Sequence, residues 1–447
     1  MKRTWMSLQK RIDLSLRHPC GRARSGRIEL AETLNLRNLM KTQIQSFIVA
    51  WSLIAGRGAV AQTAGNTQAT NPDDVRAAVY NYNNPLTGKE VMGPAGPLPA
   101  QGWFPSEDDV LNVRKLGAKG DGVTDDTEAL QAIFKKADNG QVIFFPAGKY
   151  LISDTLKLNN LYGVQIVMHG GFRSDNLRTA DCRGIFWSAK GPEDRPMLLL
   201  YNCSWVTLEG LKLDGGGRAQ DGLILDTESS AAVFKGDMVH IRSCARYGLR
   251  IATWRANHPV GGVDLAFINF SNSRFTGCGS KAGQKDANVT VESGQSLLIL
   301  FDTCHFSCSG SDYLEYNVYM RGGQANFLNC SFGSANTFAD IYIGENYTAT
   351  VNASLCHSEG ITGQHYFLYV DNPQPSAVGA CTLERIGTGG KVFFNAANTI
   401  TISNSALYDV DIPCPDAKVV LFNDHIYGKL SLGTKSVFST NVVVTPR

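Results

Sequence analysis

Short segments of alternating apolar and polar residues recur from about residue 142 onward, separated by Gly, Asn, Ser and Asp. In one recurring four-residue segment the second and fourth positions are apolar almost throughout, whereas the third varies. These segments are residues 222–225, 248–251, 288–291, 317–320, 340–343, 365–368 and 391–394. Because side chains of a strand alternate between its two faces, the second and fourth positions should point inward and the third outward.

A column of cysteines follows the same repeat. Cys304, Cys330, Cys356 and Cys381 recur about every 25 residues, and Ser405 continues the series. Coils of this length stack about 4.8 Å apart, so that like residues fall on like residues. The pattern therefore predicts an all-β solenoid, a single-stranded parallel β-helix, with the cysteines mostly as an inward ladder of free thiols.

Disulfides stay open as the alternative for the cysteines, because the spacing between rungs lies within the range that a bridge can span. Cys304 with Cys308, or Cys414 with another loop cysteine, are the better candidates for such a bond.

Residues 125–137 predict a helix at the N-terminal end of the solenoid. Asp125 and Glu128 fit a D-x-x-E capping box, and Leu130, Ile133 and Phe134 share one side. Such an N-terminal capping helix would cover the open end of the first coil. For Asp121 and its neighbouring acids, turn and cap chemistry is favoured over metal binding or acid catalysis.

Residues 115–150 combine a Gly-Asp-Gly turn, this helix and an apolar strand that runs into Phe145-Pro146-Ala147-Gly148. The combination resembles the opening of the pectate lyase-like superfamily, which includes pectate lyases, polygalacturonases and rhamnogalacturonases. The resemblance implies a right-handed parallel β-helix over residues 109–447 and an activity on polysaccharides. The N-T-D, G-H-G and R-I-K blocks of polygalacturonases are absent, so the resemblance does not place a catalytic centre.

The N-terminal third of the chain has a different character. Residues 1–39 are Arg-rich and read as a disordered or mis-assigned extension, the alternative being a genuine N-terminal segment. Residues 40–61 carry Lys41, an apolar core and an A-x-A site, as a signal peptide does. Residues 62–108 are rich in Asn, Gly, Pro and Ala and predict an extended arm or linker. We therefore expect a secreted or periplasmic protein.

The composition of the chain limits the classes of partner that we expect. The chain has 447 residues, 43% hydrophobic and 18% charged, with a formal net charge of only +2. That balance gives no global basic field for nucleic acid, and the mature region has no apolar run long enough for a membrane. We expect a polysaccharide partner, no metal and no cofactor unless a lyase activity requires calcium; the oligomeric state stays open.

The outward positions of the repeat mix aromatic rings, carboxylates and arginines along one strip. Rings stack on sugar faces, arginine binds uronate carboxylates through two hydrogen bonds, and paired acids transfer protons. The candidate catalytic residues are Asp226, Glu292, Asp340, Glu345 and Arg321. The candidate substrate-binding residues are Arg250, Tyr319, Tyr342, Phe367 and Tyr369.

Residues and resemblance together predict a secreted polysaccharide-degrading enzyme. It would be a glycoside hydrolase or a polysaccharide lyase acting on an acidic, pectin-like or exopolysaccharide glycan. The alternative is a non-catalytic glycan-binding or structural β-helix protein.

Overall fold

The computed structural model describes residues 92–93, 96–97, 109–171, 183–226, 233–252, 267–279, 286–292, 298–307, 314–333, 337–344, 349–359, 365–372, 379–387 and 390–446. The chain divides into two compact units. In the first, β1 (Met92–Gly93) pairs antiparallel with β2 (Gly96–Pro97). The predicted extension and signal peptide lie outside the described residues, as does nearly all of the predicted arm.

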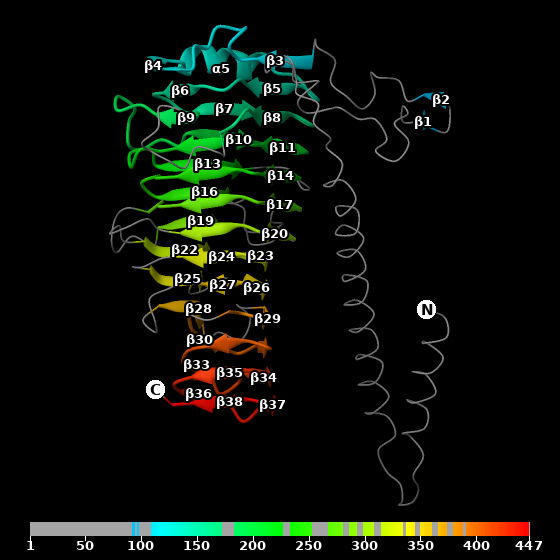
Figure 1. The fold of residues 1–447 in the computed structure, drawn as a ribbon, viewed down its shortest axis with the longest axis vertical. Helices are drawn as coiled ribbons and strands as arrows, with labels where there is room; N and C mark the ends of the chain where they lie inside the picture. Colours follow the sequence, from blue (N-terminus) through cyan, green and yellow to red (C-terminus); the bar gives the residue numbers. More distant parts are fainter. Residues whose placement is uncertain are drawn as a thin grey trace, which may run out of the picture. The chain divides into compact units, whose positions relative to one another are not determined.

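The second unit is a right-handed parallel β-helix, as predicted, whose successive coils contribute strands to three long parallel sheets (Figure 1). The thirteen-stranded sheet contains, in order, β3 (Val110–Asn112), β5 (Val142–Phe145), β8 (Gln165–Met168), β11 (Val206–Glu209), β14 (Phe234–Asp237), β17 (Ile268–Ser271), β20 (Ile299–Asp302), β23 (Gly323–Leu328), β26 (Ala349–Ser354), β29 (Cys381–Glu384), β31 (Thr399–Ser403), β34 (Lys418–Phe422) and β37 (Val437–Thr440).

The nine-stranded sheet contains β4 (Asp121–Asp125), β6 (Lys149–Ile152), β9 (Gly184–Trp187), β12 (Lys212–Asp214), β15 (His240–Arg242), β18 (Arg274–Thr276), β21 (His305–Ser307), β24 (Ser331–Gly333) and β27 (His357–Ser358). In the last coils a three-stranded sheet follows it, made of β32 (Ala406–Leu407), β35 (His425–Tyr427) and β38 (Val443–Thr445).

The eleven-stranded sheet contains β7 (Leu156–Asn159), β10 (Leu198–Tyr201), β13 (Asp221–Asp226), β16 (Tyr247–Ala252), β19 (Ala287–Val291), β22 (Leu314–Met320), β25 (Thr337–Ile343), β28 (Tyr366–Asn372), β30 (Lys391–Ala396), β33 (Val410–Ile412) and β36 (Leu430–Leu432). Among the described residues no helix has the length and apolar character needed to span a membrane.

The predicted alternation of inward and outward positions is confirmed along most of the eleven-stranded sheet. Leu223 pairs with Leu249, and Leu249 with Val289, and all three are fully buried in one core. The third positions between these apolar residues point away from that core, as Arg250 does. The alternation therefore holds the coils in register, because a slip by one residue would expose the whole apolar set.

Residues 365–368 break the predicted register. A β-bulge shifts the pairing between Tyr366 and Leu368, and Phe367 is buried with Leu368 in the core. The prediction that Phe367 contacts substrate is therefore wrong. Tyr369 takes the outward place and pairs with Tyr342. An extra residue in one strand reverses the faces of the residues before it, which the repeat length does not reveal.

The cysteine ladder is confirmed for Cys304, Cys330 and Cys356, which lie at one corner between strands. Each is buried and follows a residue in the left-handed region, such as Asn329 with φ of 53°. Cys381 does not belong to this column: it lies in β29 opposite Ile400. Its interval of about 25 residues is a coincidence of loop lengths.

The described cysteines are all buried free thiols: Cys203, Cys244, Cys278, Cys304, Cys330, Cys356, Cys381 and Cys414. The suggested disulfides of Cys304 and Cys414 are therefore wrong. Burial raises the pKa of the Cys330 thiol, so that it stays protonated and packs as a small apolar group.

The core beside these corners is filled by two columns of phenylalanine. Phe301 stacks on Phe327 with ring centroids 5.3 Å apart, and Phe306 stacks on Phe332 at 4.9 Å. Rings of the two columns meet edge to face, as Phe301 and Phe306 do at 5.4 Å. Stacked and edge-to-face aromatic pairs each add roughly 0.5–1.5 kcal/mol beyond burial, so these columns rigidify the coils that carry the outer face.

One helix, α5 (Thr127–Lys136), lies at the end of the stack next to β4 and β5 in Figure 1. Its Leu130, Ile133 and Phe134 are buried in the solenoid core. A role as the cap of the solenoid stays a prediction.

The predicted capping box does not form at the start of α5. Asp126 is the N-cap residue, but its carboxylate accepts hydrogen bonds from the Lys119 and Gly120 N–H groups at 2.6 and 2.9 Å instead. Asp121 accepts from the Thr124 and Val123 N–H groups, which lowers its pKa to about 2. The acids of this segment therefore hold its turn, in agreement with the favoured interpretation.

A polar position on the nine-stranded sheet makes stability depend on pH. His240 is only 2% exposed, and its Nε2 lies 3.1 Å from the Thr276 hydroxyl. Burial, followed by the positive charge of Lys212, lowers its pKa to about 3.

Replacing Cys330 by Arg should destabilise the solenoid by about 3–5 kcal/mol, because it buries an unpaired charge. Cys330→Ser is the matched control and should cost about 1 kcal/mol or less. Ser405 already occupies the same corner, where its hydroxyl donates to the Ser403 carbonyl at 2.9 Å. Urea unfolding measures both variants. Equal stability of wild type and Cys330→Arg would show that this corner faces outward.

Lowering the pH from 7 to 5 should cost about 2 kcal/mol of folding free energy through His240 alone. Its pKa is lower in the folded state, so the unfolded chain takes up a proton near pH 6.5 that the folded chain accepts only near pH 3. The neutral His240 side chain thus contributes its full share of stability above pH 6.5, and this contribution is lost as the pH falls toward 3. His240→Gln keeps a nitrogen near Thr276 but cannot take up the proton. The slope of the unfolding free energy against pH between pH 5 and 6 should therefore fall by the equivalent of about one bound proton. The same slope in both proteins would contradict the account.

Candidate functional site

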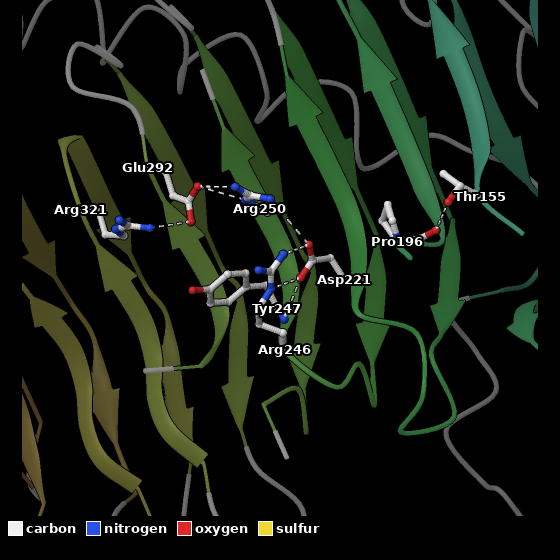
Figure 2. Close-up of polar contacts among 8 residues, drawn as sticks. All are labelled: Thr155, Pro196, Asp221, Arg246, Tyr247, Arg250, Glu292 and Arg321. Atoms are coloured by element: carbon white, nitrogen blue, oxygen red, sulfur yellow. Dashed lines mark hydrogen bonds and ion pairs between the residues drawn. The ribbon is translucent and has the colours of Figure 1, made fainter. Parts of the chain in front are cut away.

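The outer face of the eleven-stranded sheet carries a network of paired charges, shown in Figure 2. Asp221, at the start of β13, has a fully buried side chain. Arg246 donates to both of its oxygens, from Nε at 2.9 Å and from Nη2 at 2.6 Å. The Tyr247 N–H donates to the same carboxylate at 3.3 Å. The Asp221 carboxylate is thus fixed by hydrogen bonds from a side chain and from a backbone N–H group at the start of the neighbouring strand, β16 (Tyr247–Ala252).

Arg250 joins this pair to a second carboxylate. Its Nε and Nη2 donate to Glu292 Oε2 at 3.0 and 2.8 Å, and its Nη1 lies 3.9 Å from Asp221 Oδ2. Arg321 Nη1 donates to the other oxygen of Glu292 at 3.1 Å. One guanidinium therefore bridges two carboxylates (Figure 2). We call Asp221, Arg246, Arg250, Glu292 and Arg321 the charge network.

Strand register creates the charge network. Asp221 pairs with Tyr247 on β16, and Val291 on β19 pairs with Ile251 on β16 and with Met320 on β22. Glu292 and Arg321 directly follow those paired positions, at the ends of their strands. Residues up to 42 positions apart in the chain thus contact each other across neighbouring coils.

The charge network is partly shielded from water and carries one more positive group than negative. The side chain of Glu292 is 11% exposed, and those of Arg250 and Arg321 are 30% and 36% exposed. Contacts between such groups are less screened than those of a fully solvated surface. The network can therefore present guanidinium N–H donors and a carboxylate to a ligand in a fixed arrangement.

Tyr247 adds a proton donor beside the charge network. Burial, followed by the negative charge of Glu292, raises the pKa of its phenol to about 12, so that the hydroxyl stays protonated at neutral pH. The Arg246 guanidinium lies 4.8 Å from the centre of the ring. This cation–π contact fixes the ring, and Figure 2 shows the hydroxyl pointing away from Asp221.

Three of the predicted site residues, Glu292, Arg321 and Arg250, are brought together in the charge network. Asp226 lies at the end of β13 and is partly exposed. Glu345 lies outside the described residues. Among the residues that the structure does describe, no three His, Cys, Asp or Glu side chains are grouped so that they could hold a metal ion.

Asp340 does not belong to the exposed strip, contrary to the prediction. It is 1% exposed, and Asn317 Nδ2 and Ser358 Oγ donate to its two oxygens at 2.9 and 2.6 Å. His365 Nε2 lies 3.4 Å from it. The first position of the repeat turns into the corner between sheets, so these side chains form a buried ladder that Asn288 extends.

Tyr319 and Tyr342 lie on the outer face as predicted, but they are only 5% and 6% exposed. Their rings pack against each other and against Tyr316, which stacks on Tyr342 at 4.3 Å. The aromatic row continues through Tyr369, which stacks on Phe393 at 4.7 Å, and both of these keep exposed surface. Ring–ring packing therefore accounts for the middle of the row, and sugar stacking on any of these rings stays a prediction.

Asp221, Arg246 and Tyr247 were missed from the sequence. The repeat itself contains the signal for two of them, because Asp221 and Tyr247 each stand one position before the four-residue segment and pair in register. Extending the segment by one position would have shown a column that alternates large and small residues through Ala287 and Tyr316.

Comparison with known proteins supports this architecture. Residues 110–187 match the family model described as rhamnogalacturonase A/epimerase, pectate lyase-like. The probable glucan endo-1,3-beta-glucosidase of Arthroderma benhamiae is 51% identical over 213 residues, which cover 47% of this chain and 20% of that protein. The chain thus spans about a fifth of the length of this fungal relative.

Two further similarities involve phage and bacterial proteins. The capsule-specific depolymerase 1 of Klebsiella phage K5-2 is 24% identical over 258 residues, covering 46% of this chain and 30% of that protein. A polygalacturonase from Erwinia carotovora has a TM-score of 0.43 at 12% identity, covering 72% of this chain and 94% of that chain.

The family match at residues 110–187 falls on the first coils of a solenoid built from three parallel sheets. Over these first coils the chain is similar to the pectate lyase-like family of rhamnogalacturonases and epimerases.

Proposed function

We propose that this protein is a secreted polysaccharide-degrading enzyme that acts on a glycan lying over the outer face of the eleven-stranded sheet. The observation that carries the proposal is the charge network beside Tyr247, in which Arg250 contacts both Asp221 and Glu292. The names of the fungal glucosidase and the phage depolymerase support the same class of substrate.

Structural stability alone is a poor explanation of the charge network. Exposed ion pairs contribute about 0–1 kcal/mol each, and shielding charged groups from water costs free energy. Asp221 is nevertheless completely buried and is paired with two arginines. Fixed, shielded charges of both signs on a surface are typical of sites that stabilise charge during a reaction.

The chemistry assigns a role to each group. Glu292 acts as the nucleophile or base, held by Arg250 and Arg321, and the Tyr247 hydroxyl donates a proton to the leaving oxygen. Asp221 positions Arg246 and Arg250. In a hydrolase the bond from the anomeric carbon to the glycosidic oxygen breaks and water adds across it. In a lyase the base removes the proton from the carbon next to the uronate carboxylate, the bond from the neighbouring ring carbon to the glycosidic oxygen breaks, the leaving oxygen takes up a proton, and an unsaturated sugar remains.

Two substrate classes have separate support. The excess of guanidinium groups supports an acidic glycan, because arginine binds carboxylates through paired N–H donors. The name of the fungal relative supports a neutral 1,3-β-glucan instead. Assays on polygalacturonate and on a soluble 1,3-β-glucan distinguish them. Reducing ends alone indicate hydrolysis, and reducing ends with ultraviolet absorbance of unsaturated uronate indicate a lyase.

Glu292→Gln should lower kcat on the accepted polysaccharide at least a thousandfold, because the amide lacks the charge and basicity of the carboxylate. Glu384→Gln is the matched control, since this carboxylate lies on the thirteen-stranded sheet with a 40% exposed side chain. It should leave the rate unchanged. Release of reducing ends measures both. A Glu292→Gln enzyme of normal rate and stability would place the reaction elsewhere.

Tyr247→Phe should lower kcat by a factor of about 10²–10⁴, the usual contribution of a positioned proton donor, with little effect on KM. The phenyl ring keeps the packing of Arg246, so thermal stability should change little. The rate profile of the wild type at alkaline pH provides a second readout, because the phenol loses its proton only near pH 12. An unaltered kcat would exclude the hydroxyl from the reaction.

A further inference from the structure

A groove lies far along the chain from the charge network, at a corner of the last coils. Its volume is ≈ 480 Å³, within the range of about 300–1,000 Å³ typical of sites for small molecules. Arg385, Asn404, Asn423 and Asn441 line one side, and Ala406 and His425 belong to the strands on the other.

The groove exists because two small residues follow each other in one column. His357 pairs with Gly387, and Ala406 pairs with His425, so that Gly387 and Ala406 lie between two histidines. Gly387 has no side chain, and a Cβ there would come within 2.9 Å of His357 Nδ1. At these two coils the groove is therefore lined by small residues.

The first wall is a column of left-handed corner residues. Arg385, Asn404, Asn423 and Asn441 have φ between 52° and 57°, so they occupy equivalent places in four successive coils. Asn423 Nδ2 donates to Asn404 Oδ1 at 2.9 Å. This bond leaves the amide donors of Asn404 and the amide acceptor of Asn423 at the surface.

The second wall is held rigidly. The His425 ring stacks on Tyr427 with centroids 4.1 Å apart, and its Nε2 lies 2.9 Å from the Thr445 hydroxyl. Across the groove the Arg385 side chain is 59% exposed, with its Nε 3.8 Å from Glu384. The walls thus offer donors and acceptors together with the edge of an aromatic ring.

The chemistry of these walls matches a hydroxylated, uncharged ligand. Sugar hydroxyls both donate and accept, as the paired amides do, whereas an anion needs donors only. Asp424 lies under the floor, 2% exposed, and accepts from the Ser405 and Phe422 N–H groups at 2.9 Å. A carboxyl group in this place gives an anionic ligand no additional attraction.

We propose that this groove is a second, non-catalytic binding site for a neutral oligosaccharide. It anchors the protein on a glycan while the charge network, on another sheet and on earlier coils, carries out the reaction. The groove does not depend on the proposed catalysis, because none of its residues belongs to the charge network.

Ala406→Trp tests the site by filling the groove, since Ala406 points outward and is partly exposed. Ser331→Trp is the matched control: Ser331 begins β24 in the column that leads to His357, outside the groove, and is likewise partly exposed. Affinity electrophoresis in gels containing soluble 1,3-β-glucan, hydroxyethyl cellulose or mannan measures binding, with polygalacturonate at low and high salt as the charged probe.

The wild type and Ser331→Trp should be retarded by at least one neutral glycan, and Ala406→Trp should bind it at least tenfold more weakly. In the Glu292→Gln background, which removes the proposed catalysis, Ala406→Trp should weaken retardation by the same factor, which separates failure of this site from failure of the proposed catalysis. Equal retardation of Ala406→Trp and wild type would overturn the proposal. So would retardation by polygalacturonate alone, or by none of the probes.

Discussion

The parallel pairing of each coil with the next is the constraint on which everything else in this protein depends. Backbone hydrogen bonds hold successive strands about 4.8 Å apart and in register. Buried columns such as Leu223, Leu249 and Val289 make any other register costly, because a slip would expose them. The same register that aligns apolar residues inside aligns polar residues outside, and a surface site is thereby built from distant parts of the chain.

Much of the fold could be predicted because its cause is local and repeated. Alternation within short strands, left-handed corners and small buried residues recur in every coil, so an error in one coil does not alter the others. Cys304, Cys330 and Cys356 fell into one column for this reason. Cys381 and Phe367 did not, because one loop length and one β-bulge shift the pattern locally without changing the average repeat.

The candidate site was only partly predictable for a related reason. Glu292, Arg250 and Arg321 stand at outward positions of the repeat, and sequence is sufficient to find those. Asp340 shows what sequence does not contain, since a position that looks exposed turns into a corner and accepts hydrogen bonds from Asn317 and Ser358. Asp221 shows the converse: its fully buried side chain faces the outer network and not the core.

The most direct test of the account is a double-mutant cycle on Arg250 and Glu292, measured by urea unfolding. These residues lie 42 positions apart and meet only if the coils stack in the observed register. The account predicts that Arg250→Met, Glu292→Gln and the double variant show a coupling energy of about 0.5–3 kcal/mol. If the free-energy changes of the two single variants add up to that of the double variant within about 0.3 kcal/mol, the two side chains do not contact each other. That result would contradict the charge network and the chemistry proposed for it.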